Sequence, residues 1–169
     1  MRGLILSIAF VLASSASVFG QKYGYVDSEY ILSNIPDYKQ AQSQLDNMSA
    51  QWQGEIESLF SESEALQVAL NAEKILLTEE MVSEREKLID EKKTEARTLQ
   101  QQYFGPEGEL FKKRLELIKP IQDQIYNAIQ SVAKQKKYDI FCDKASELMM
   151  LYTNPKADLS DEVLESLGY

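Results

Sequence analysis

Apolar residues recur at helical spacing through most of this 169-residue chain. Positions 37–104 contain no proline and one glycine, Gly54, and at ~1.5 Å per residue an unbroken helix of this length would reach about 100 Å. In the first half of the stretch the apolar side chains repeat at intervals of seven, with others three or four residues away, as in a coiled coil. This apolar stripe consists of Tyr38, Leu45, Trp52, Leu59 and Leu66, together with Ala41, Met48, Ile56 and Leu70.

A helix of this length must either fold back or form an extended rod. We expect a fold-back between positions 71 and 78, because Thr78 supplies an N-cap oxygen and the acidic Glu79 and Glu80 favour a helix start. The alternative is one unbroken rod, since neither glycine nor proline marks the turn. Past the turn, the stripe is expected to lengthen its period to eleven residues, as in Leu66, Leu77, Leu88 and Leu99.

A second interruption is predicted at positions 105–108. Gly105, Pro106 and Gly108 place two glycines and a nitrogen without a hydrogen within four residues. We expect this break to act as a hinge, because glycine permits φ changes that a helix does not. Apolar residues then resume the spacing of three and four up to Val132, and Pro120 is expected to bend this helix without ending it.

The two ends of the mature chain carry β-type patterns. Short aromatic and branched segments predict strands at 23–27, 138–143 and 148–152. A helical turn is expected directly after the first strand, stopped by Pro36. A final short helix over 163–167 is predicted by the acidic N-cap segment 158–162 before it and by Gly168 after it.

The first twenty residues resemble a secretory signal peptide. Arg2 gives a positive start, an apolar run follows, and small residues end at Gly20. The run is shorter than the ~20 residues of a spanning helix, so we expect removal after Gly20, or alternatively after Ala16. No cysteine follows that could carry a lipid, and the mature chain is expected to be soluble outside the cytoplasm.

Composition excludes several classes of chemistry. The chain has no histidine, which rules out catalytic sites and zinc sites that depend on this residue. The single Cys142 permits neither an internal disulfide nor a cysteine cluster, and a buried, inert thiol is the favoured interpretation. Carboxylates on a long polar helix are typically solvated. We therefore expect no enzyme activity, no catalytic residue, no cofactor and no metal site.

The net charge of −9 disfavours nucleic acid as a partner, because little on such a surface would neutralise phosphates. Short strands need more neighbours than one chain supplies, and a two-helix hairpin buries only a narrow stripe. The strands of several copies are therefore expected to join into one β structure, with the hairpins projecting from it.

Motifs along the whole mature chain resemble the Skp/OmpH family of periplasmic chaperones, in its Bacteroidetes-like form. They are Tyr25-Val26-Asp27-Ser28, Pro36-Asp37-Tyr38-Lys39, Gly105-Pro106-Glu107-Gly108, Lys119-Pro120-Ile121, Tyr138-Asp139, Leu151-Tyr152-Thr153-Asn154-Pro155, Asp158, Asp161-Glu162-Val163 and Leu167-Gly168. The resemblance implies an α+β, mainly α fold in which a long antiparallel helical hairpin forms an arm and terminal strands form a small β body on trimerisation. It also implies a homotrimer in the periplasm that holds unfolded outer-membrane β-barrel proteins in a cavity between its arms, without ATP. The absence of a glycine-rich phosphate loop agrees with that mechanism.

Carried onto this chain, the family pattern implies an oligomerisation body at 21–36 and 137–169 and an arm at 37–136. The residues implied at the strands that form the trimer are Tyr25, Val26, Ile140, Phe141, Leu148, Met150 and Leu151. The inner faces of the arms would contact the client. Trp52 and Met48 are expected to pack within the stripe rather than to bind clients.

Charge separates this chain from well-known members of the family, which are basic. Segment 37–104 has 14 acidic and 7 basic residues, whereas 106–137 has 4 and 7. Contact with lipopolysaccharide or membrane is therefore disfavoured, leaving Lys112-Lys113-Arg114 and Lys134, Lys136 and Lys137 as the only basic candidates, with solvated helix faces as the simpler interpretation. The alternative function is a structural coiled-coil spacer or adaptor of the envelope. Glu55, Glu62 and Ser63 interrupt the apolar stripe, which favours the chaperone over a rigid spacer.

Overall fold

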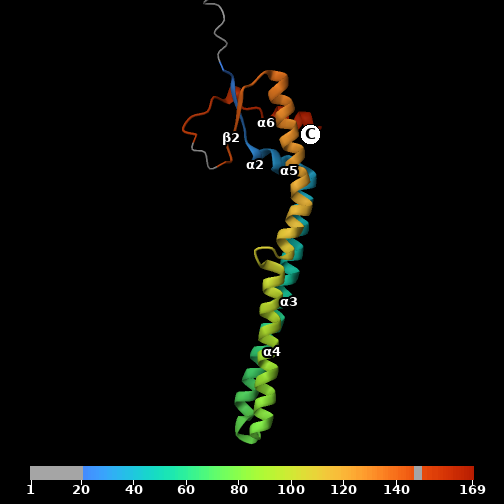
Figure 1. Ribbon diagram of the computed structural model, residues 1–169, viewed down its shortest axis with the longest axis vertical. Coiled ribbons are helices and arrows are strands. Elements are labelled where there is room, and N and C mark those ends of the chain that lie inside the picture. The colour runs from blue at the N-terminus through green and yellow to red at the C-terminus, as the bar shows by residue number, and fades with distance from the viewer. Residues whose placement is uncertain (1–20, 147–149) are drawn as a thin grey trace, which may run out of the picture. The chain divides into compact units, whose positions relative to one another are not determined.

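The computed structural model describes residues 21–146 and 150–169, which form two compact units (Figure 1). The first unit joins the N-terminal part, up to Asn34, to the C-terminal part from Ile125 onward, and the second comprises Ile35–Gln124. The predicted signal peptide, residues 1–20, lies outside the described residues. Among the helices of the described ranges, none combines the length and apolar character needed to cross a membrane.

The second unit contains an antiparallel pair of helices, here called the hairpin. Helix α3 (Pro36–Glu73) begins with proline in its first turn and leads into the short 3₁₀-helix η1 (Lys74–Leu76), after which α4 (Glu79–Phe104) runs back along it. The Thr78 hydroxyl oxygen accepts a hydrogen bond from the Met81 N–H at 3.3 Å, which caps α4. The fold-back is therefore confirmed at the predicted place, and the unbroken rod is wrong.

The predicted apolar stripe of α3 is buried or half-buried. Ala41, Leu45, Ile56 and Leu70 are buried along it. The predicted change to an eleven-residue period in α4 is wrong at its clearest point, because Leu88 is 42% exposed and Ile89 only 3%. Ile89 lies seven residues before the buried Ala96, so the buried face of α4 keeps the seven-residue period.

Helix α4 ends at Phe104, and α5 (Glu109–Lys136) begins after a short loop. This loop is the interruption predicted at positions 105–108. Pro120 lies within α5 and does not end it, as expected. Neither loop glycine has a positive φ. Both positions need glycine because a side chain would not fit. A Cβ at Gly108 would lie 2.7 Å from the Tyr103 carbonyl oxygen and 2.8 Å from that of Gln102. A Cβ at Gly105 would collide with the Gln101 carbonyl.

The first unit is built around two parallel strands, β1 (Tyr23–Val26) and β2 (Ile140–Asp143), with Tyr23 opposite Ile140 and Val26 opposite Asp143. Helix α2 (Ser28–Asn34) follows β1 directly and contacts the C-terminal helix α6 (Ser160–Leu167) (Figure 1). Ile31 of α2 and Val163 of α6 are completely buried. These two helices thus supply the apolar core beside the small sheet.

The predicted strand over 148–152 is wrong where it can be judged. Residues 150–152 form no strand, and Leu148 lies outside the described residues. The free side of β1 is instead bridged by Asp158, with the Leu159 N–H donating to the Tyr25 carbonyl at 3.0 Å. A strand needs a hydrogen-bonded neighbour, and on the side of β1 away from β2 this neighbour is the segment after the 3₁₀-helix η2 (Pro155–Ala157).

Two helices end with the same hydrogen-bonded motif. After α6, Gly168 adopts a left-handed conformation with φ 93°, and the Tyr169 N–H donates to the Leu164 carbonyl at 3.0 Å. After α5, Lys137 takes this position with φ 55°, and the Tyr138 N–H donates to the Ala133 carbonyl at 2.9 Å. Both arrangements are Schellman C-caps, in which glycine is the usual residue at the left-handed position.

Two glycine-to-alanine substitutions should act in opposite directions. Gly54 lies exposed inside α3 with open space around its Cα, so Gly54→Ala should stabilise the protein by about 0.5–1 kcal/mol. Gly108→Ala should destabilise it, because the new Cβ would meet backbone atoms at 2.7–2.9 Å. Urea unfolding followed by circular dichroism checks both, and a Gly108→Ala protein as stable as the parent would contradict the steric explanation.

Candidate functional site

The surface of the hairpin carries a groove between α3 and α4, here called the hairpin groove. Its volume is about 520 Å³. Ile56 forms its buried floor, while Phe60 and Phe104 are each 37% exposed. The complete lining is Gln53, Ile56, Glu57, Phe60, Gln100 and Phe104. The groove thus combines exposed aromatic rings with two amides and one carboxylate.

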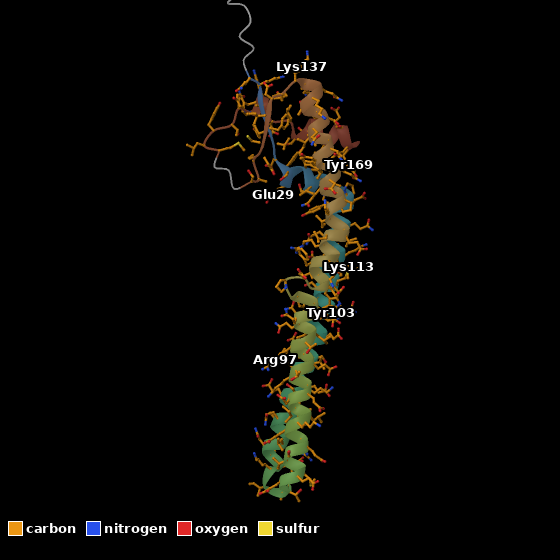
Figure 2. All side chains as sticks on the ribbon, viewed as in Figure 1. Glu29, Arg97, Tyr103, Lys113, Lys137 and Tyr169 are labelled. Carbon is orange, nitrogen blue, oxygen red and sulfur yellow. The ribbon has the colours of Figure 1, made fainter. Side chains whose placement is uncertain are left out.

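An aromatic cluster fixes the α4 side of this region. The rings of Trp52 and Tyr103 stack with centroids 4.7 Å apart, and Phe104 meets Trp52 edge-on at 6.3 Å. The Tyr103 hydroxyl, on the α4 residue labelled in Figure 2, donates to Glu55 at 3.1 Å. Burial raises the pKa of Tyr103, and the Glu55 carboxylate raises it further. Trp52 therefore packs inside the hairpin, as predicted.

The polar residues that interrupt the stripe make contacts within the hairpin. Glu62 pairs with Lys92 of α4 at 3.0 Å, and this hydrogen bond raises the pKa of Lys92. Ser63 is buried, and its hydroxyl donates to the Phe60 carbonyl at 2.8 Å. With Glu55 held by Tyr103, the interruptions link the two helices or satisfy their own backbone. Because each of the three is engaged within the hairpin, their presence no longer distinguishes a chaperone from a rigid spacer.

Large apolar side chains nevertheless remain exposed on the hairpin. At its turn, Ile75 is 95% exposed and Leu76 is 85% exposed. Other exposed side chains occur on both helices: Phe60, Val68, Met81, Leu88 and Phe104. Scattered exposed apolar residues are common on soluble proteins, but this set follows the hairpin from its turn to its groove. It offers many shallow apolar contacts and no deep pocket.

A polar network joins the strands and helices of the first unit around Asp27. Its carboxylate accepts from the Tyr30 N–H at 3.0 Å, which caps α2, and from the Lys144 ammonium at 3.1 Å. Its own N–H donates to the Ser160 hydroxyl at 2.9 Å. The Tyr30 N–H and Lys144 hold the pKa of Asp27 below its usual value. One residue therefore connects β1, α2, α6 and the segment after β2.

Other carboxylates in this unit are satisfied in the same way. Asp143 accepts from the Ser28 hydroxyl at 2.6 Å, Asp158 from the Ser160 hydroxyl at 2.6 Å, and Asp161 from the Tyr30 hydroxyl at 3.0 Å. The bond to Asp161 raises the pKa of Tyr30. A concavity of about 340 Å³ lies among these groups, but internal hydrogen bonds already use its acidic side chains. Over residues 21–146 and 150–169, no set of three cysteine or carboxylate side chains is placed to hold a metal ion.

The structure brings four of the residues implied for oligomerisation into one sheet. Tyr25 and Val26 of β1 are buried, whereas Ile140 of β2 is 45% exposed and Phe141 half-buried. Met150 and Leu151 lie outside any strand, and Leu151 is 91% exposed. Sequence reasoning missed Asp158 and Leu159 as partners of Tyr25. Cys142, expected to be buried, is a free thiol of intermediate exposure on β2.

The basic clusters are partly neutralised by neighbouring acids. Lys112 pairs with Glu109 at 3.0 Å, and Lys113, labelled in Figure 2, pairs with Glu116 at 2.7 Å. Lys136 pairs with Glu162 of α6. These contacts favour the simpler interpretation of charge-balanced helix faces over a site for anionic lipid.

Comparisons with known families, proteins and solved structures agree with one another. The family model described as "Outer membrane protein (OmpH-like)" matches residues 22–167. Chaperone protein Skp of Yersinia enterocolitica is 24% identical over 161 residues, which cover 95% of this chain and 94% of that protein. The crystal structure of an OmpH-like protein of Caulobacter crescentus CB15, proposed to be an outer membrane chaperone, superposes with a TM-score of 0.68 at 16% identity, over 89% of this chain and 86% of the other.

Removing the Asp27 carboxylate should reveal its contribution to stability. The pKa of Asp27 is lowered in the folded protein from 3.8, so its stabilising effect is present above about pH 4 and is lost as the pH falls toward the folded value. Asp27→Ala should cost about 1 kcal/mol at pH 7, and this difference should shrink at pH 3.

Urea unfolding of the mature protein at the two pH values measures both effects. Asp27→Asn is the matched control, because asparagine keeps the capping oxygen but loses the charge beside Lys144. A cost of Asp27→Ala that stays the same at pH 3 and pH 7 would contradict this account.

Proposed function

Because this chain belongs to the OmpH-like family, we propose that it is a periplasmic chaperone that binds unfolded outer-membrane proteins and prevents their aggregation. It acts without ATP, as a holdase. The client lies in a cavity between helical arms, each of which contains the hairpin and the helix after it. Release then needs no chemical step, and the protein is not an enzyme.

The observation that carries this proposal is the row of exposed apolar side chains on the hairpin. Ile75, Leu76 and Val68 are 95, 85 and 64% exposed, and each can make a weak contact with an apolar segment. Contacts of this kind add through the effective concentration of a linked chain, so a long unfolded client is retained although each contact is easily broken. A native protein would not be bound, because its apolar side chains are buried.

A homotrimer is the assembly we propose for the body, here residues 21–36 and 137–169. Two strands make a marginal sheet, and Tyr23, Ile140, Leu151 and Tyr152 are 55, 45, 91 and 83% exposed. Pairing between copies would cover these side chains and complete the sheet. The arm is then residues 37–136, and its break at Gly105, Pro106 and Gly108 is proposed as the hinge. The N-terminal signal peptide directs export and is then removed, after Gly20 or Ala16.

One observation favours a second candidate, a structural spacer or adaptor of the envelope. The contacts Glu62–Lys92 and Glu55–Tyr103 link α3 to α4, which would suit a stiff rod. A spacer predicts one defined folded partner, so a pull-down from envelope extract dominated by a single folded protein would support it. A chaperone should instead retain a range of unfolded barrel proteins.

An aggregation assay tests the chaperone directly. The mature protein, without nucleotide, should suppress light scattering of an outer-membrane barrel protein diluted from urea when trimer and client are equimolar. Its mass by light scattering should be three times that of one chain. No suppression at several-fold excess, or a stable monomer, would contradict the proposal.

A pair of surface variants tests whether the exposed apolar residues contact the client. Val68→Ser combined with Met81→Ser should weaken suppression, because both side chains are exposed and their loss removes client contacts with little effect on folding. Ser58→Ala combined with Ser83→Ala, also at exposed positions of α3 and α4, is the matched control and should leave suppression unchanged.

A further inference from the structure

The hairpin groove has a chemical character that the scattered apolar residues lack. Phe60 and Phe104 expose aromatic surface above the buried Ile56, and the amides of Gln53 and Gln100 line the groove from α3 and α4. An amide side chain both donates and accepts. It can therefore satisfy the N–H and C=O groups of an extended backbone that has no secondary structure of its own.

Charge around the groove has one sign on its α3 side. Positions 50–64 hold four carboxylates and no basic residue. Glu62 is paired with Lys92, and Glu55 accepts from the uncharged Tyr103 hydroxyl. Glu57 lines the groove itself. The α3 side of the groove is therefore negatively charged. Of its carboxylates, only Glu62 is paired with a cation, Lys92.

The facing part of α4 does not compensate for this charge. Positions 96–104 contain one charged residue, Arg97. Arg97, labelled in Figure 2, lines a different concavity of the hairpin together with Thr94, Thr98, Gln101 and Gln102. An apolar groove with an uncompensated carboxylate at its edge favours a ligand in which an apolar side chain lies next to a cation.

We propose that the hairpin groove binds extended polypeptide segments in which an aliphatic or aromatic side chain is followed by a lysine or arginine. The apolar side chain lies on Ile56, Phe60 and Phe104, the cation lies near Glu57, and Gln53 and Gln100 hydrogen-bond the segment's backbone. This inference rests on the proposed chaperone function and adds the class of segment that the hairpin selects.

Binding of designed peptides to the whole mature protein tests the groove. Fluorescence anisotropy compares three labelled peptides of equal length, with repeating Leu–Lys, Leu–Glu and Ser–Lys pairs separated by glycine and serine. The Leu–Lys peptide should bind at least tenfold more tightly than either of the others. Its advantage over Leu–Glu should shrink in 0.5 M NaCl, where the screening length falls to about 4 Å. Equal affinity for Leu–Lys and Leu–Glu would overturn the proposal.

Variants separate the groove from the general negative charge of the protein. Phe60→Ser should lower Leu–Lys affinity several-fold, and Glu57→Lys should abolish the preference for Leu–Lys over Leu–Glu. Asp90→Asn, which removes an exposed carboxylate of α4 outside the groove, is the control and should change neither. Unchanged binding by Phe60→Ser and Glu57→Lys, both at exposed helix positions, would overturn the proposal.

Intrinsic fluorescence gives a second readout, because Trp52 is the only tryptophan and contacts Phe104 of the groove. Its emission should change on titration with Leu–Lys and much less with Ser–Lys. If Phe60→Ser instead lowers the oligomer mass of the free protein, the groove is a contact between copies and the proposal fails.

The barrel aggregation assay keeps the two proposals apart. Protection of the barrel protein without any Leu–Lys preference refutes the groove alone. Groove-dependent binding of Leu–Lys without barrel protection supports the groove and refutes the chaperone function.

Discussion

β1 ends at Val26 and β2 begins at Ile140, and the two strands pair in parallel across 113 intervening residues. Closing a flexible loop of that length would cost about 4 kcal/mol in chain entropy, more than two short strands can offset. Stiff helices lower this cost, because α2, α3, α4 and α5 make up most of the intervening residues and leave few of them flexible. Asp27, Asp143 and Ser160 then fasten the joined ends with hydrogen bonds. Pairing of the two strands is therefore favoured by the helical order of the segment between them.

The hairpin combines two kinds of surface that serve different purposes. Between its helices, Glu62–Lys92 and Glu55–Tyr103 supplement a narrow apolar stripe in which Ala41 and Ala96 are among the buried residues. Exposed ion pairs add little stability individually, so the pairing of α3 with α4 depends mostly on its apolar contacts. On their outer faces, the same helices expose large apolar side chains to solvent. Such a surface is tolerable because the net charge of −9 keeps the protein soluble by opposing non-specific aggregation.

Sequence alone placed most elements because local signals and tertiary structure agree. Thr78 caps α4 where an N-cap was expected, the break at 105–108 separates α4 from α5, and Gly168 ends α6. The predictions failed where contacts with residues distant in the sequence determine the structure. The β-type pattern of Leu151-Tyr152 forms no strand, and the free side of β1 is bridged by Asp158 instead. The groove could not be foreseen either, since Ile56, Phe60 and Gln100 meet only through the register of the two helices.

At the junction between α5 and β2, a charged residue stands where glycine would give the less strained backbone. Gly168 and Lys137 occupy equivalent positions after their helices, yet a side chain at a positive φ costs roughly 1–2 kcal/mol that glycine avoids. Lysine gives a cation in return at the negative end of the α5 dipole, close to Lys134 and Lys136. Glycine at this position would exchange that electrostatic gain for a relaxed chain reversal, so the reversal that leads from α5 into β2 is held at some cost to stability.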